Sequence, residues 1–315
     1  MSLNAKWLDS ASCDAARMGR ENPDVLISVV GPTASGKTDL ALAIAEQMSG
    51  EIISVDSVQV YREFDRGTGK PNPEERALVP HHIIDVCDPH DAIDAAQFVT
   101  LADRAIADVR ARGRVPIVCG GTFLWMRALL LGLAPIPPGD ESIRRELRTL
   151  ADSQGAESLH AMLRQVDEAS AERLHPNDFV RVSRALEVFR ISGKPLSVWH
   201  SEHAFRGVRH PHRMIGIDQP RDVLDARIRS RIDGWMAAGW VADVQNLIDR
   251  GYLYARAMGS VGFAEIARAL EEAKQGSIAL DTQALTQQIV SKTRVFVRRQ
   301  RTWLRDETIT WYPTV

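Results

Sequence analysis

The sequence predicts an α/β fold, in which a parallel β-sheet forms the core and a helical domain is inserted into it. Three observations lead to this prediction. A short apolar run at Val25–Val30 is followed by a glycine-rich turn and a helical pattern; short apolar runs and helical segments then alternate; and residues 141–192 are helical almost throughout. Alternating strands and helices are typical of parallel sheets, and a wholly helical stretch between two such parts indicates an insertion.

The first part of the chain supplies the expected strands of the core. Continuous apolar runs that suit buried parallel strands lie at Val25–Val30, Glu51–Val55 and Val115–Cys119. Apolar residues recur at helical spacing in Asp39–Met48 and Gln97–Arg112. The segment Pro71–Asp94 is rich in Pro, Asp and His, and we expect it to be irregular.

The helical insertion begins at a break rich in proline and glycine, Ala134–Asp140, and we place it at residues 135–212. Within it, the motif HPND at His175–Asp178 is typical of a helix start, with Asn177 or Asp178 as the cap. Gly193 and Pro195 are expected to end that helix.

The chain is then expected to return to the core, which would comprise residues 25–134 and 213–315. His212–Ile217 suits another strand, and Thr308–Tyr312 suits a last edge strand. Between these two strands we expect long helices at Arg221–Arg250, Val261–Lys274 and Asp281–Arg305. Residues 1–24 are polar and of mixed charge, and we expect them to form a loose leader.

Composition excludes several classes of protein. The formal net charge of −2 gives no overall attraction to nucleic acid, so any RNA contact must come from local basic patches. The three widely spaced cysteines form neither a CxxC pair nor a metal cluster and suggest a reduced, cytoplasmic protein. No apolar run approaches the ~18 residues of a membrane span, and the first residues lack the apolar core of a signal peptide.

The turn after the first strand matches a phosphate-binding P-loop. GPTASGKT at Gly31–Thr38 fits G-x-x-x-x-G-K-[ST] and lies between a strand and a helix, as this motif requires. Its glycines let backbone N–H groups approach phosphate oxygens, and the helix start adds a positive dipole end. Lys37 adds a charge, and Thr38 can bind Mg²⁺. The core is therefore P-loop NTPase-like, and ATP, GTP or a prenyl diphosphate would each fit the loop.

Asp56 follows the second strand, at the sheet edge where parallel sheets bind ligands. Three interpretations stay open: a Mg²⁺ ligand, a general base and a purely structural carboxylate. Cys119-Gly120-Gly121-Thr122 ends the third strand without an acidic residue, and the chain has no guanine-reading N-K-x-D motif, which argues against a GTPase. Thr122 is expected either to hydrogen-bond a reacting group or to cap a helix.

A basic segment near the C-terminus indicates a polyanionic partner. No acidic residue interrupts it, and like charges on one helix repel one another unless a polyanion binds them. Its members are Lys292, Arg294, Arg298, Arg299, Arg301 and Arg305. Arg181, Arg184, Arg190 and Lys194 form a second, weaker patch, in which Arg181 and Arg184 could instead pair with Glu187.

Taken together, these motifs resemble those of the bacterial tRNA dimethylallyltransferases, also called tRNA isopentenyltransferases or the IPP transferase family. GPTASGKT alone occurs in many kinases, but the combination in this order is specific and runs through almost the whole chain. The matching stretches are GPTASGKT (31–38), SVDSVQVY (54–61), GTGKP (67–71), GGTFLW (120–125), HPND (175–178), RVSRALEVF (181–189), ISGKP (191–195) and RQRTWLR (299–305).

The resemblance implies transfer of a dimethylallyl group from dimethylallyl diphosphate to N6 of adenine 37 in tRNA, by a monomer that uses Mg²⁺. It implies that Asp56 is the base, that Thr122 positions the reacting groups and that Arg231 binds diphosphate. The implied diphosphate site is Gly31, Pro32, Thr33, Ala34, Ser35, Gly36, Lys37 and Thr38, with Thr38 on the metal. The implied tRNA contacts are Asp56, Ser57, Val58, Gln59, Thr122, Arg144, Val180, Arg181, Val182, Ser183, Arg184, Arg298, Arg299, Gln300, Arg301, Thr302, Trp303, Leu304 and Arg305.

One stretch departs from the pattern of the family. Gly259–Ala264 keeps the V-G core with Phe263 in place of Tyr, but lacks the basic residue that often flanks each side of it. Two other readings of the whole chain remain: a small-molecule kinase that uses ATP, with Asp56 on Mg²⁺, and a non-catalytic RNA-binding ATPase. Only the transferase needs both a base beside the P-loop and a basic C-terminal helix.

Overall fold

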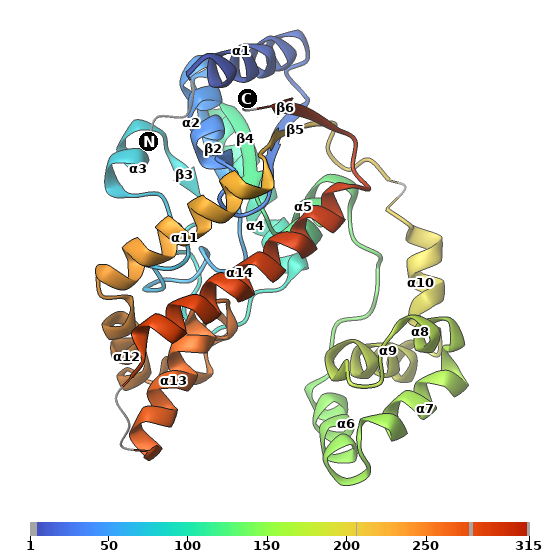
Figure 1. Ribbon diagram of the computed structural model, residues 1–315. Helices are drawn as coiled ribbons and strands as arrows, with labels where there is room; N and C mark the ends of the chain where they lie inside the picture. The colour runs from blue at the N-terminus through green and yellow to red at the C-terminus, as the bar shows by residue number, and fades with distance from the viewer. Residues whose placement is uncertain (1–4, 206, 277–279, 314–315) are drawn as a thin grey trace. The chain divides into compact units, whose positions relative to one another are not determined.

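The computed structural model describes residues 5–205, 207–276 and 280–313 and confirms the predicted α/β fold (Figure 1). Six parallel strands form one sheet in the order β3-β2-β4-β1-β5-β6. The strands are β1 (Leu26–Val30), β2 (Gly50–Val55), β3 (His81–His82), β4 (Val115–Gly120), β5 (His212–Asp218) and β6 (Ile309–Pro313).

The helices of the core alternate with these strands, as right-handed crossovers between parallel strands require. They are α1 (Ala5–Glu21), α2 (Lys37–Met48), α3 (Pro73–Leu78), α4 (Ala95–Ala111), α5 (Phe123–Leu131), α11 (Arg221–Ala237), α12 (Trp240–Asp249), α13 (Phe263–Gly276) and α14 (Thr282–Leu304). Two 3₁₀ turns, η1 (Tyr252–Tyr254) and η2 (Arg256–Gly259), connect α12 to α13. In the part of the chain that the structure describes, no helix is long and apolar enough to cross a membrane.

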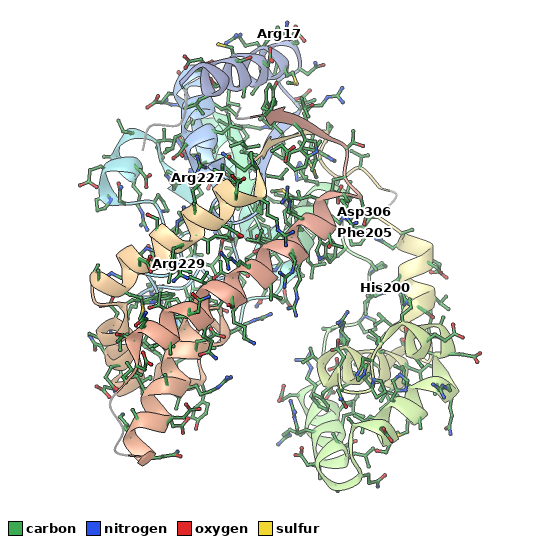
Figure 2. The ribbon with its side chains drawn as sticks, viewed as in Figure 1. Arg17, His200, Phe205, Arg227, Arg229 and Asp306 are labelled. Carbon is green, nitrogen blue, oxygen red and sulfur yellow. The ribbon has the colours of Figure 1, made fainter. Side chains whose placement is uncertain are left out.

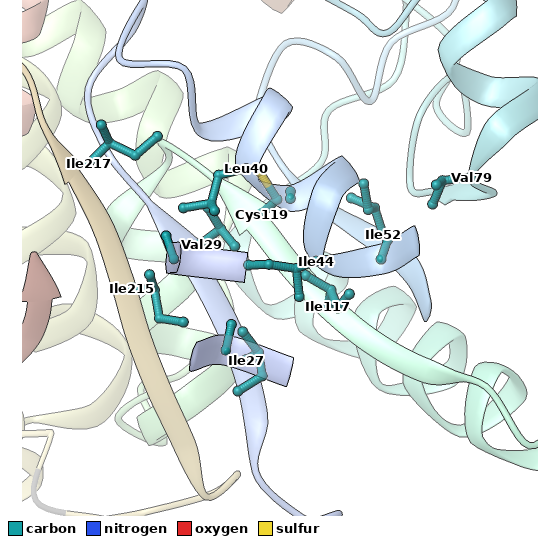
Figure 3. Packing of buried hydrophobic residues seen from close by; sticks show 14 residues of the cluster. Ile27, Val29, Leu40, Ile44, Ile52, Val79, Ile117, Cys119, Ile215 and Ile217 are labelled. Atoms are coloured by element: carbon teal, nitrogen blue, oxygen red, sulfur yellow. The ribbon is translucent and has the colours of Figure 1, made fainter. Parts of the chain in front are cut away.

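Apolar side chains on one face of the sheet pack against α2 and hold the P-loop side of the core together. Ile27, Ile117 and Ile215 come from three adjacent strands and meet Leu40 and Ile44 of the helix (Figure 3). All five are fully buried, and each contributes roughly 1.5–3 kcal/mol of burial free energy. This packing fixes the start of α2, and therefore the P-loop, against the ends of β1 and β4.

The carboxyl ends of the central strands lie level with one another. Val30 of β1 and Val55 of β2 both pair with Gly120 of β4. A Cβ atom on Gly120 would lie 2.1 Å from the carbonyl oxygen of Val55, so no side chain fits there. The loops that leave these three strands therefore begin side by side, and they form the floor of the site described below.

The leader is not loose, contrary to our expectation. Ala5–Glu21 forms α1, which packs against α2. Ala11, Ala15 and Ala16 are fully buried, and Leu8 and Met18 pack beside them against the core. Alanines therefore supply much of the buried face of this helix, and they give a weak apolar pattern in the sequence. Residues 1–4 and 314–315, which we had assigned to the leader and to the core, lie outside the described residues.

Two further expectations were wrong in detail. The helix expected over Arg221–Arg250 is two helices, because Gly239 adopts a left-handed φ of 96° and caps the start of α12. The segment expected to be irregular contains α3, whose capping box joins Asn72 and Glu75, and the short strand β3.

Residues 131–209 form a second compact unit, close to the expected insertion at 135–212. Its helices are α6 (Glu141–Gln154), α7 (Ala156–Val166), α8 (Glu168–Arg173), α9 (Phe179–Ser192) and α10 (Leu196–His203). It has its own core, in which Leu147, Leu163 and Leu186 are buried. Asp178 caps α9 by accepting a hydrogen bond from the Arg181 N–H at 3.2 Å.

Candidate functional site

A cavity of about 520 Å³ opens at the carboxyl ends of the central strands. The P-loop, the Asp56–Gln59 turn and the Cys119–Thr122 turn each contribute to its lining. Further lining residues come from α11, α14, Trp240 of α12, the turn around Gly67 and the segment before α13. Ligands of open parallel sheets bind at this edge, and the cavity is large enough for a small organic diphosphate and part of a nucleotide.

The P-loop has the backbone conformation of an anion site. Ala34 and Gly36 adopt positive φ angles of 67° and 97°, and α2 begins directly at Lys37. Successive N–H groups in such a turn form a concave donor surface, and the helix dipole favours negative charge at the same place. A Cβ atom on Gly31 would lie 2.6 Å from Ser35 Oγ, which explains why glycine starts the loop.

Lys37 supplies a cation inside this turn. Its side chain lies deep among protein atoms but keeps part of its surface open to the cavity, and Nζ donates to the Pro32 carbonyl at 3.4 Å. Burial lowers the pKa of Lys37 below its ordinary value, and the negative charge of Asp56 opposes that shift. An anion in the cavity would stabilise the charged ammonium further.

Cys119 lies beside Lys37, at the end of β4. Its thiol is buried and donates a long hydrogen bond of 3.8 Å to the Lys37 carbonyl oxygen. Burial raises the pKa of Cys119 to about 11, so this thiol stays protonated at neutral pH.

Two arginines from consecutive turns of α11 reach the P-loop region in different ways. Arg227, labelled in Figure 2, donates to the carbonyl oxygens of Ala34 and Ser35 at 3.4 and 3.2 Å and so braces the loop. Arg231 instead lines the cavity and is open to solvent there. Burial of its inner part lowers the pKa of Arg231, and the charge of Asp39 opposes this shift. The structure therefore places Arg231, and not Arg227, where a bound diphosphate could meet it.

Asp56 also lines the cavity. Its Oδ1 accepts hydrogen bonds from the N–H groups of Val58 and Gln59 at 2.9 and 3.2 Å, which fixes the carboxylate in a tight turn. No hydrogen bond to Oδ2 is found among the described residues. Asp56 thus has one oxygen that holds the turn and one that can accept a proton from a ligand.

Thr122 ties this turn to the end of β4. Its Oγ1 accepts a hydrogen bond from the Ser57 N–H at 3.0 Å and donates one to Ser57 Oγ at 3.3 Å. The observed bonds of the Thr122 hydroxyl to Ser57 correspond to neither of the two roles expected for it, because they hold the Asp56 turn. Thr122 also lines the cavity, so it can contact a reacting group there.

Gln59 has a structural role that the sequence did not indicate. Its side-chain oxygen accepts from Ser54 Oγ at 3.1 Å, and its amide donates to the carbonyls of Thr68 and Gly69 at 3.2 and 3.0 Å. The amide therefore fixes the turn that contains Gly67, where a Cβ atom would lie 2.2 Å from the Trp240 ring. Ser57 and Val58 remain partly exposed to the cavity.

The apolar wall of the cavity went unnoticed in the sequence. It comes from segments far from the P-loop, and its members are Ile228, Ile232, Trp235, Trp240, Val261, Ile289 and Phe296. Helical spacing on α11 and α14 would have identified these residues only as buried ones. Gly259, Ser260 and Val261 also line the cavity, while Phe263, the residue in place of Tyr, is buried in the core.

Helix α14 presents several cations to solvent, but not all of the expected residues. Arg298, Arg299 and Arg305 are exposed and have no ion-pair partner among the described residues, and Thr302 and Trp303 are also exposed. Arg301 lies 3.6 Å from Asp218, and Arg294 lies 3.2 Å from Asp225. Gln300 and Leu304, both expected to contact tRNA, are buried, so their side chains do not belong to the exposed face of α14.

Of the tRNA contacts expected in the helical unit, some side chains are exposed and others are buried. Val180 and Arg181 are exposed, although Arg181 Nε donates to Asp178 at 2.6 Å. Val182 and Ser183 are buried, so neither side chain is free to meet RNA.

Arg144 and Arg184 are held by a buried carboxylate. Glu187 accepts from Arg144 Nε at 2.9 Å and from the Asp140 N–H at 2.7 Å, and it also pairs with Arg184. Arg184 donates further to the Pro137 carbonyl at 2.7 Å. Both arginines therefore stabilise the start of α6 in addition to any role with RNA.

Replacing Glu187 by alanine should destabilise the helical unit by about 2–3 kcal/mol. Removal of one partner from a buried ion pair costs ~3–5 kcal/mol, and the partial exposure of both arginines reduces that cost. Thermal unfolding would measure the loss. An equally large loss for Glu146→Ala, whose pair with Arg190 is more exposed, would contradict this account.

The cavity contains oxygen groups that suit a magnesium ion bound together with a ligand. No group of three or more His, Cys, Asp or Glu side chains suited to a metal is found among the described residues. The Thr38 hydroxyl lines the cavity near Asp56. A hard cation prefers oxygen ligands and keeps several waters, so the residues fit an ion that Thr38 shares with diphosphate oxygens and water.

Comparisons with known proteins agree with this geometry. The family model described as IPP transferase matches residues 59–307. A tRNA dimethylallyltransferase of Sorangium cellulosum is 54% identical over 92% of this chain and 90% of its own length. The crystal structure of a tRNA isopentenylpyrophosphate transferase from Bacillus halodurans is 33% identical, with a TM-score of 0.66 over 92% of this chain and 90% of that one.

A eukaryotic dimethylallyltransferase, solved in crystallographic snapshots of its action on tRNA, has a similar fold. Its TM-score is 0.76 at 24% identity, over 92% of this chain and 74% of that one. The matched region of the family model contains Gln59, Thr122, Arg231 and the basic face of α14, whereas the P-loop and Asp56 precede it. The chain belongs to the IPP transferase family.

Proposed function

We propose that this protein transfers a dimethylallyl group from dimethylallyl diphosphate to N6 of adenine 37 in tRNA and releases diphosphate. The observation that carries the proposal is that a cationic P-loop and the carboxylate of Asp56 line one cavity. The family and the printed names of its relatives support the same reaction.

The cationic side of the cavity serves the leaving group. When the bond between C1 of the allyl group and the diphosphate oxygen breaks, both electrons and the negative charge go to the diphosphate. The turn that leads into α2 orders the P-loop N–H groups, and Lys37 and Arg231 line the same cavity, so these groups would stabilise that charge electrostatically. When bound through Thr38, Mg²⁺ would neutralise part of the same charge.

The carboxylate side serves the nucleophile. The N6 amine of adenine is a poor nucleophile, because its lone pair is delocalised into the ring. As the bond between N6 and C1 forms, the nitrogen must lose a proton, and Asp56 Oδ2 is the group placed to accept it. Such general-base catalysis contributes roughly 10²–10⁴-fold in rate.

The acceptor base must leave its stack to enter the cavity. Extrusion is least costly from a single-stranded loop such as the anticodon loop. Phe296 lines the cavity with 42% of its surface exposed and offers an aromatic face to an extruded base. We further propose that the enzyme acts as a monomer, as the resemblance to the family implies.

Transfer of label tests the proposed reaction. Wild-type protein, incubated with Mg²⁺, unmodified tRNA and dimethylallyl diphosphate labelled in the allyl group, should place label in the RNA and release diphosphate. A tRNA with guanine in place of adenine 37 is the matched control. Label in that control would show that adenine 37 is not the acceptor. Phosphorylation of a small molecule by ATP, without transfer to RNA, would indicate a kinase instead.

We expect the double variant Arg298→Ala, Arg299→Ala to bind tRNA about tenfold or more weakly and with a flatter salt dependence. Each lost phosphate contact lowers the slope of log K against log salt by about 0.7–0.9. Filter binding between low and moderate salt would measure both quantities. The matched control is Arg20→Ala, Arg114→Ala, which removes two exposed arginines near the amino ends of β1 and β4. An unchanged salt slope in the Arg298→Ala, Arg299→Ala variant would show that α14 does not contact tRNA.

A further inference from the structure

A buried amide on α14 joins the P-loop to the wall that carries Thr122. Gln300 is only 4% exposed. Its Oε1 accepts a hydrogen bond from the Thr33 N–H at 2.9 Å, and its Nε2 donates to the Gly121 carbonyl at 3.1 Å. The two bonded loops follow different strands, β1 and β4, so one side chain connects them across the cavity floor.

We propose that Gln300 is a positioning residue that sets the distance between the diphosphate cradle and the Asp56 carboxylate. The connection continues beyond Gly121, because the next residue, Thr122, is bonded to the backbone of Ser57 at 3.0 Å. Ser57 directly follows Asp56. A chain of short contacts therefore runs from the P-loop through Gln300 to the base, and this inference rests on the proposed function.

The sheet alone does not fix this distance. Strand pairing holds Val30, Val55 and Gly120 in register, but the P-loop extends past Val30 before α2 begins. In that stretch Thr33 is the residue whose N–H is bonded to a side chain. The bond also withdraws the Thr33 N–H from a bound anion, so the later N–H groups of the loop must form the anion site.

The space around the Gln300 amide, like its hydrogen bonds, restricts which side chains fit at this position. A Cβ atom on Gly121 would lie 2.7 Å from Gln300 Nε2, so the turn is shaped around this side chain. Thr33 and Gly121 offer one donor and one acceptor, and a glutamine amide matches both in one orientation. A hydrophobic side chain of similar size satisfies neither of them, and an ionised carboxylate satisfies only the Thr33 donor.

The first test is Gln300→Leu, which removes both hydrogen bonds and keeps most of the volume. We expect kcat for transfer to fall about 10–100-fold, because misplacement by about 1 Å can cost ~10²-fold. The Kd for tRNA should stay within about twofold, since Arg298 and Arg299 remain. The matched control is Gln288→Leu, the same change at an exposed position of the same helix, which should leave kcat unaltered.

The second test uses pH. Gln300→Glu keeps the shape and the acceptor for Thr33, but its carboxylate places a second oxygen opposite the Gly121 carbonyl. Only the protonated acid can donate there, and burial favours that neutral form. The ratio of variant to wild-type kcat should therefore rise as the pH falls from about 8 to about 6. A residue that only fills space would give a flat ratio.

The outcomes separate the inference from the function on which it rests. A wild-type protein without label transfer overturns the proposed function. Wild-type transfer with unchanged kcat in Gln300→Leu, or with a weakened Kd for tRNA as the only effect, overturns the positioning role alone. If Gln300→Leu fails to fold, as judged by circular dichroism, the pH ratio of Gln300→Glu decides the question.

Discussion

Asp56→Asn is expected to lower kcat by about 10²–10⁴-fold while tRNA affinity stays close to that of the wild type. Asparagine keeps an oxygen that accepts the N–H groups of Val58 and Gln59, so the turn should survive the change. What the variant loses is the carboxylate oxygen that takes a proton. The defect should therefore lie in the chemical step, which single-turnover label transfer measures.

Asp91→Asn is the matched control for this prediction. Asp91 is an exposed aspartate of the segment before α4 and does not line the cavity. It should keep wild-type turnover. Should Asp56→Asn turn over at the wild-type rate, Asp56 is not the base, and the carboxylate serves only to hold its turn.

Lys37→Met should reduce kcat/KM for dimethylallyl diphosphate by about 10²–10³-fold, the usual cost of removing one fixed donor from a site of developing charge. Methionine keeps the length and the apolar stem of lysine, so packing against the P-loop is largely preserved. Steady-state transfer at saturating tRNA would measure the effect. Lys274→Met, at an exposed position of α13, is the control.

The same residue gives a prediction for the pH dependence of the wild type. Burial lowers the pKa of Lys37, so its ammonium loses its proton at a lower pH than an ordinary lysine. Affinity for the diphosphate should be complete below that pKa and should decline as the pH rises through it. Lys37→Met should lack this alkaline decline; an identical decline in the variant would assign it to another group.

The sequence was sufficient to predict those parts of the site that lie next to one another in the chain. Val25–Val30, the P-loop and the following helix form a local unit, and the position of Asp56 after the next strand placed it at the same sheet edge. The apolar wall was not predictable in this way. Trp240 and Phe296 are brought to the cavity by tertiary packing, and periodicity alone identifies such residues only as buried.

Charged and polar residues were harder to assign, because a sequence does not state which partners they find. The run of arginines on α14 correctly predicted that Arg298 and Arg299 are exposed. Gln300, which lies between Arg299 and Arg301, is instead buried and hydrogen-bonded to the P-loop. Arg144 and Arg184 likewise have a common partner in Glu187. The prediction of a loose leader was wrong for a different reason. The fully buried apolar residues of α1 are alanines, which add little to an apolar pattern in the sequence.

The thiol of Cys119 has a consequence for an enzyme that handles an alkylating agent. An allylic diphosphate reacts with strong nucleophiles, and a thiolate is among the strongest that a protein contains. Cys119 stands in the cavity wall, but burial raises its pKa to about 11 and keeps it as a neutral thiol. Burial of this thiol at the end of β4 thus disfavours modification of the enzyme by its own substrate.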